Sequence, residues 1–208
     1  MTIAAWTNIA LSRLSGALPD VVTAELVETI DEFCRRSTAW REMVYALDIT
    51  ANVREITPVI GDGSKAEVLG ILRVYYNQNR MGDYSHVPFE APGDLHGSYT
   101  ARSDSPNIIN LSSIPINNQT GVIDTLVYAK PVNAASYIPA VLSDQFYDFI
   151  LDGLLGRMYA HQGRPYTNDA LAVAFTRKFS ADVKSARDMA NRGFTANAQN
   201  WTFPIFGR

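Results

Sequence analysis

The hydrophobic period changes from helical to strand-like within residues 20–49, which read DVVTAELVETIDEFCRRSTAWREMVYALDI. The first half carries one apolar stripe at helical spacing, formed by Val22, Leu26, Ile30 and Phe33. With Asp20 as the N-cap, this stripe predicts a helix from about Val21 to Arg36. From Met43 to Ile49 every second residue is a large apolar one, which predicts a strand. The chain therefore passes here from a helical segment into a β segment.

Helical spacing also occurs at both ends of the chain. Residues 3–15 predict a short helix that Gly16 and Pro19 interrupt. A third helix is predicted from Ser143, as its cap, to about His161, and a fourth from Thr167 or Asn168 to about Arg192. The short connection at 162–167 predicts that the last two helices form an antiparallel hairpin.

Between these helices, short β-branched and aromatic runs predict further strands. They are 53–58, 67–76, 108–111 and 122–129. Residues 51–52 and 61–64 predict turns, and 77–106 reads as one long irregular loop, rich in Asn, Gly, Pro, Asp and Ser. We expect an antiparallel β subdomain of about five strands.

The order of these elements predicts an α+β fold, since each helix has a single apolar stripe that must be buried. The economical arrangement packs the N-terminal helices on the C-terminal hairpin. We therefore expect a helical frame from 1–40 and 137–193, with 41–136 as an inserted β subdomain and 194–208 as an extended C-terminal arm.

The last fifteen residues, FTANAQNWTFPIFGR, are aromatic but have no helical or alternating period. Their large apolar and proline side chains are Phe194, Trp201, Phe203, Pro204, Ile205 and Phe206. Such side chains gain free energy when they are buried, and Trp and Phe are typical interface anchors. The arm either folds back on its own domain or docks as an extended peptide into a groove on a partner; we predict the partner.

The composition of the 208 residues excludes several classes of function. Apolar residues make up 47% of the chain, which suits a folded globular protein, and the formal net charge of −3 does not suit a surface that grips DNA. The single cysteine, Cys34, excludes an internal disulfide and reads as a small buried hydrophobe. We see neither a signal peptide nor an apolar run long enough for a membrane helix, so we expect an intracellular protein without membrane contact.

We find no catalytic motif: neither a phosphate-binding loop, nor a nucleophile elbow, nor a zinc-protease signature. His86 and His96 flank Glu90 and Asp94 in the long loop, but the spacing matches no standard set of metal ligands. We interpret them as solvated loop residues, and His161 as a helix C-terminal residue. We therefore predict that the protein is not an enzyme and holds no cofactor or metal.

Acidic side chains recur on two of the predicted helices. Asp144, Asp148 and Asp152 have i,i+4 spacing and predict an acidic face, either merely solvated or facing a polyanion that it repels. Glu28 and Glu32 lie beside arginines and are expected to face water. Arg187 and Arg192 on the last helix offer positive partners for an acidic face on a neighbouring copy.

Five segments resemble podovirus-type head-to-tail adaptor proteins of tailed phages. Three lie in the first half of the chain: EFCRRSTAWRE (32–42), DITANVREITPV (48–59) and LGILRVYY (69–76). The second half is similar through YIPAVLSDQFYDFILDGLLGRMYAH (137–161) and FTRKFSADVKSARDMANRG (175–193). The resemblance covers most of the chain except the loop at 77–106.

The resemblance implies a virion structural protein that forms a ring, commonly of twelve copies, under the portal protein. It also implies that the C-terminal arm reaches the portal, that the β part meets the next tail component, and that DNA passes through the lumen during ejection without specific binding. Two alternatives stay open. One is another tail-tube or nozzle component of the virion, and the other is a small-molecule-binding enzyme that uses the 77–106 loop.

Overall fold

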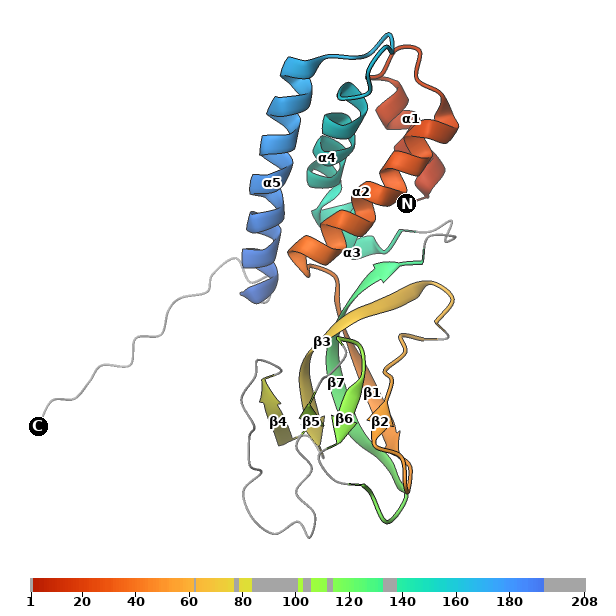
Figure 1. Cartoon of the computed structure of the whole chain (residues 1–208), viewed down its shortest axis with the longest axis vertical. Helices are drawn as coiled ribbons and strands as arrows, with labels where there is room; N and C mark the ends of the chain where they lie inside the picture. The colour runs from red at the N-terminus through yellow and green to blue at the C-terminus, as the bar shows by residue number, and fades with distance from the viewer. Residues whose placement is uncertain are drawn as a thin grey trace, which may run out of the picture.

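The computed structural model describes residues 2–61, 63–76, 79–83, 101–102, 106–111, 114–132 and 138–192. Helices occupy one end of an elongated molecule and strands occupy the other (Figure 1). The strands are antiparallel, so the predicted α+β class is confirmed. The division of the chain into domains stays a prediction.

Five α-helices are present in the described part of the chain. They are α1 (Ile3–Leu11), α2 (Pro19–Ser37), α3 (Ala140–Gln145), α4 (Tyr147–Tyr159) and α5 (Asp169–Asn191). Asn168 caps α5, and its side chain accepts a hydrogen bond from the Leu171 N–H at 3.0 Å. The prediction that Asp20 caps α2 is wrong. This helix begins at Pro19, two residues before the predicted Val21, because proline has no N–H to satisfy and its fixed φ suits the first helical position.

The predicted helix from Ser143 to His161 is also wrong, because two helices, α3 and α4, occupy this segment. Phe146 separates them, with a φ of −122° and a ψ of 14°. Its ring is fully buried and lies 5.3 Å from the Phe33 ring and 5.8 Å from the Phe149 ring. The break between α3 and α4 therefore occurs at an aromatic residue of the core. The local sequence pattern does not reveal this break.

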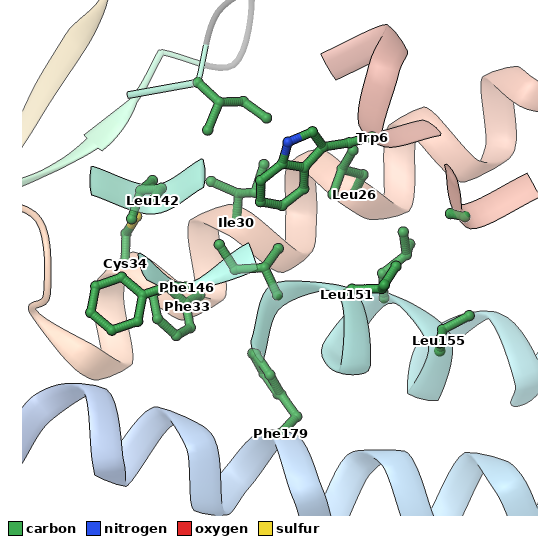
Figure 2. Packing of buried hydrophobic residues seen from close by; sticks show 14 of the residues in the cluster. Trp6, Leu26, Ile30, Phe33, Cys34, Leu142, Phe146, Leu151, Leu155 and Phe179 are labelled. Carbon is green, nitrogen blue, oxygen red and sulfur yellow. The ribbon is translucent and has the colours of Figure 1, made fainter. Parts of the chain in front are cut away.

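The helices from both ends of the chain share one hydrophobic core. Helix α2 packs against α1, α4 and α5, and Figure 2 shows Phe33, Phe146 and Phe179 meeting inside. Gly153 on α4 allows this close approach. A Cβ at this position would lie 2.7 Å from the Phe179 ring and 2.8 Å from Thr29 Cγ2. A glycine is therefore required where α2, α4 and α5 meet.

The described residues contain seven strands in two antiparallel sheets, where the sequence predicts an antiparallel β subdomain of about five strands. The first has the order β1 (Arg41–Ile49), β7 (Gln119–Pro131), β3 (Ala66–Tyr76), β4 (Asn79–Asp83), and the second β2 (Glu55–Ile56), β6 (Ile109–Leu111), β5 (Ala101–Arg102). A second core lies between them, and it includes Ile49, Val74, Ile109, Leu111 and Ile123. Strands β4 and β5 lie within 77–106, so this segment is not one continuous loop. Strand β2 covers two residues, and therefore less than the predicted 53–58.

Backbone irregularities interrupt the regular pairing of β1 with β7 near its outer end. Ala46 has a φ of 57° and Gly121 a φ of 65°. The pairing register of β1 with β7 shifts between Val44 and Leu47 and again between Leu47 and Ile49. Two aspartates accept hydrogen bonds from these backbone N–H groups: Asp124 from Ala46 at 2.9 Å and Asp48 from Gly121 at 2.7 Å. The side chains thus replace the ladder bonds that the irregular strand does not make.

Candidate assembly surfaces

The six side chains predicted as partner-binding anchors of the C-terminal arm lie outside the described residues. So do His86, Glu90, Asp94 and His96 of the long loop. Residues 194–208 follow α5 in the sequence, and α5 ends at Asn191. The end of α5 is therefore the described part of the chain nearest to the arm in sequence. The role of the arm stays a prediction.

Arg41, the first residue of β1, holds the end of α5. Its guanidinium donates hydrogen bonds to the Ala190 carbonyl at 2.9 Å and to Asn191 Oδ1 at 2.7 Å. The same guanidinium also donates hydrogen bonds to the Thr38 carbonyl at 3.0 Å and to Thr38 Oγ1 at 3.2 Å. The C-terminal carbonyls of a helix have no partner within the helix, and a guanidinium satisfies them well. Burial lowers the pKa of Arg41, with a further contribution from the nearby Arg73.

A second arginine contact joins the ends of α2 and α5. Arg187 of α5 donates a hydrogen bond to the Arg36 carbonyl in the last turn of α2. The Arg36 guanidinium lies 5.7 Å from the centre of the Phe179 ring and forms an ion pair with Glu32. The two helices therefore end side by side. The last turn of α2 carries Arg35 and Arg36, which suit its helix dipole, whereas the last turn of α5 carries no basic residue. Sequence reasoning singled out Arg187 but missed Arg41.

A buried ion pair connects the helices to the larger sheet. Lys130 Nζ of β7 lies 2.6 Å from Asp31 Oδ1 of α2 and 3.4 Å from Glu67 Oε2 of β3. The Lys130 side chain is only 8% exposed. Burial alone raises the pKa of the Asp31 carboxyl, but its contacts with Arg35 and Lys130 outweigh burial and lower it. No local pattern signals this lysine, because its partners come from elements distant in the sequence.

The Glu32 side chain is 32% exposed and is engaged in ion pairs, so the expectation that it faces water holds only in part. Its two carboxylate oxygens pair with Arg36 and with Arg157 of α4, the latter at 2.8 Å. Arg157 also reaches Glu25 at 3.3 Å, and His161 Nε2 lies 3.2 Å from the other Glu25 oxygen. Glu28 is exposed, as predicted. These ion pairs connect α2 to α4 along the edge of the helical core.

The predicted acidic face of Asp144, Asp148 and Asp152 is not one face of one helix. Asp144 belongs to α3, before the break at Phe146, whereas the other two belong to α4. The Asp152 side chain is 7% exposed and pairs with Lys178 of α5 at 2.5 Å, so it is not solvated. Close packing of the helices through Gly153 places it there. Asp148 is exposed.

A different acidic group results, formed by Asp148, Asp152 and Asp182 around Lys178. Burial raises the pKa of Asp182, and the charges of Asp152 and Asp148 raise it further. Asp182 Oδ2 is buried and accepts no hydrogen bond from the residues that the structure describes. The i,i+4 spacing of Lys178 and Asp182 suggests a pair on the outside of α5. Lys178 instead pairs with Asp152 of α4, and only helix packing reveals this partner.

The turn after β1 and the segment before β7 lie at the end of the β part opposite the helices (Figure 1), and apolar side chains are exposed there. Ile116 is 86% exposed, Ile114 57% and Val53 43%. Two hydrogen bonds hold the chain here: the Asn52 N–H donates to the Pro115 carbonyl at 2.9 Å, and the Ala51 N–H to Asn118 Oδ1 at 2.7 Å. A shallow hollow of about 360 Å³ adjoins these residues, lined by Asn52, Val53, Arg54, Glu55 and Ile114. We call this region the β tip.

Within the described residues, no three His, Cys, Asp or Glu side chains are grouped so that they could hold a metal ion. Cys34 is buried as predicted, and burial raises the pKa of its thiol far above the usual range. In the same part of the chain, no helix combines the length and the apolar character needed to cross a bilayer.

Comparison with curated protein sequences finds no match. Comparison with protein families finds a match to the family described as SU10 adaptor protein, over residues 1–200. This match includes the helices, both sheets and the segments that carry the resemblance noted above. The chain therefore belongs to the SU10 adaptor protein family and is a structural adaptor protein of the phage head-to-tail type.

Proposed function

We propose that this protein forms a closed ring at the head-to-tail junction of a tailed phage, and that the ring joins the portal protein to a tail nozzle or tube protein. Membership of an adaptor family over residues 1–200 is the observation that carries the proposal. The ring contains twelve copies, as in the adaptors that the chain resembles. Its role is structural, without catalysis.

The two ends of the molecule suit two different partners. The helical end leads from α5 into the aromatic segment 194–208, and Arg41 holds the last turn of α5 in place. A rigid root limits the positions that a following segment can reach, which lowers the entropy lost on binding. We assign the portal-binding role to this segment, through Phe194, Trp201, Phe203, Pro204, Ile205 and Phe206.

The β tip suits the tail partner. Three exposed apolar side chains beside a shallow hollow are the kind of surface that a partner protein covers. The tip lies at the far end of the molecule from the helices, so one copy can contact a portal and a tail protein simultaneously (Figure 1). The mild negative charge of the chain suits a lumen through which DNA passes without specific binding.

Electron microscopy of the protein with its portal protein tests this proposal. We expect rings on the portal, and expect them to be absent when residues 194–208 are deleted, while the deleted protein keeps its Tm. A collapse of the Tm would show that the arm instead folds on its own domain. Binding to tail proteins without portal binding would support the tail-tube or nozzle alternative.

A further inference from the structure

Two surfaces of opposite charge lie on opposite sides of α5. Lys178 and Asp182 meet Asp148 and Asp152 of α4 on one side, and Arg187 meets the end of α2 at Arg36 on the other. Lys178 and Arg187 are nine residues apart, which is about two and a half helical turns and therefore half a rotation around α5. The two surfaces thus face away from each other and cannot pair within one copy.

The acidic surface consists of Asp148, Asp152 and Asp182, three carboxylates around the single ammonium of Lys178 among the described residues. Lys178 is the cation that the structure places on it, and its ammonium is engaged with Asp152. Asp148 is exposed, and Asp182 has a buried carboxylate oxygen without a hydrogen-bond donor in the described part of the chain. The exposed Asp148 carboxylate and the accessible part of Asp182 can pair with a cation from outside the molecule.

The basic surface consists of Arg36 and Arg187, both exposed, at the adjoining ends of α2 and α5. Glu32 pairs with Arg36 and also with Arg157, which Glu25 contacts as well. The contacts with the Phe179 ring and with the Arg36 carbonyl hold both side chains in place. Ordered guanidinium groups pair with carboxylates at a small entropic cost.

We propose that neighbouring copies of this chain contact each other head to tail, with Asp148 and Asp182 of one copy facing Arg36 and Arg187 of the next. The inference rests on the proposed ring and names the ionic contact within it. Because the two surfaces differ and lie on opposite sides, each copy presents its acidic surface to one neighbour and its basic surface to the other. Repeated head-to-tail contacts of this kind form a ring when the rotation between copies closes. Complementary charge also sets the register of such a contact.

Cross-linking in the junction assembled with the portal protein tests the contact. A variant with Asp144→Cys and Lys184→Cys together, at exposed sites near Asp148 and Arg187 that leave both charges in place, should give a ladder of linked copies beyond the dimer when treated with a bis-maleimide reagent. Either cysteine substitution alone should give no ladder, because in a head-to-tail contact the two positions come from different copies. Cys34 is buried and does not interfere.

Charge reversal tests the sign of the interaction. Asp148→Arg alone and Arg187→Asp alone should each weaken association by about tenfold or more, because like charges then face each other. The double variant should recover most of the loss, and Glu28→Arg, at an exposed site on α2, should cause none. Raising the salt concentration from 0.1 M to 1 M, which shortens the screening length from about 10 Å to about 3 Å, should weaken the unmodified ring.

The outcomes separate the two proposals. Rings that form without a cross-linked ladder, and that tolerate both single reversals, would overturn this contact and leave the ring proposal intact. Failure of the unmodified protein to form rings with its portal protein would overturn the ring itself. Recovery in the double variant supports the contact, since a loss of folding by either single variant would not be reversed by a second reversal.

Discussion

The helical part and the β part of this protein are stabilised in different ways. The helices share one large core, from Trp6 to Ala186, and ion pairs with Glu25, Glu32 and Asp152 connect them along its edges. The sheets enclose a smaller core and satisfy their irregular backbone with aspartate side chains. Large exposed apolar side chains gather at the β tip. The helical part thus relies on ion pairs between its helices, whereas the β part relies on side chains that complete its backbone hydrogen bonds.

The largest expected effect comes from the helical core. Phe33 is fully buried between the Phe146 and Phe179 rings, so Phe33→Ala leaves a cavity and should lower the free energy of unfolding by about 3–5 kcal/mol. Ile123→Ala in the β core removes fewer atoms and should cost less, about 2–4 kcal/mol. Urea unfolding followed by far-UV circular dichroism measures both, and the opposite ranking would contradict the comparison.

The ion pair between the two parts should have the next largest effect. Lys130→Met keeps the aliphatic stem, but it removes the ammonium and leaves Asp31 with Arg35, so we expect a loss of about 1.5–3 kcal/mol. Lys184→Met on the exposed side of α5 is the matched control and should change stability by less than about 0.5 kcal/mol. Because the folded pKa of Asp31 is lowered, the stabilisation is present above the unfolded value of about 3.9 and is lost as the pH falls through the folded pKa. An effect of Lys130→Met that persists in acid would contradict this cause.

A smaller effect of opposite sign is expected at Asp182. Its pKa is raised in the folded protein, so the folded state binds this proton more tightly than the unfolded state and ionisation costs stability above the folded pKa. Asp182→Asn should therefore raise the Tm at pH 7, by less than about 4 °C, which corresponds to 1 kcal/mol in a chain of this size.

This gain should vanish below about pH 3.9, where the carboxyl is protonated in both states. Differential scanning calorimetry at several pH values measures it, and a lower Tm at pH 7 would contradict the prediction. The same substitution should weaken the contact between copies, so the ionised Asp182 would destabilise the single copy and stabilise the assembly.

The smallest effect is expected at the β tip. Ile116 is 86% exposed, so Ile116→Ser should change the free energy of unfolding by less than about 0.5 kcal/mol. Attachment of the tail protein should nevertheless weaken if the tip is covered in the junction. Unfolding and a tail-binding assay on the same preparation measure both quantities. A marked loss of stability would show that Ile116 is packed against its own chain.

Periodicity alone was sufficient to predict the α+β class, the helical hairpin and most strand positions, because alternation and helical stripes are local signals. The stripe of Leu26, Ile30 and Phe33 and the cap at Asn168 are where the sequence places them. Local signals also misled in places. Proline displaced the expected cap at Asp20, and Phe146 interrupts a segment whose composition suits one continuous helix.

The charged surfaces depend on the folded chain. The sequence shows Asp148, Asp152, Asp182, Lys130 and Arg41 as ordinary charged residues, and i,i+4 spacing suggests partners on the same helix. Packing through Gly153 instead buries Asp152 against α5, and the meeting of β7 with α2 buries Lys130. The spacing of hydrophobic residues shows which side of a single helix or strand is buried. The partner of a charged side chain depends on which two elements pack together, and their packing is decided only when the whole chain folds.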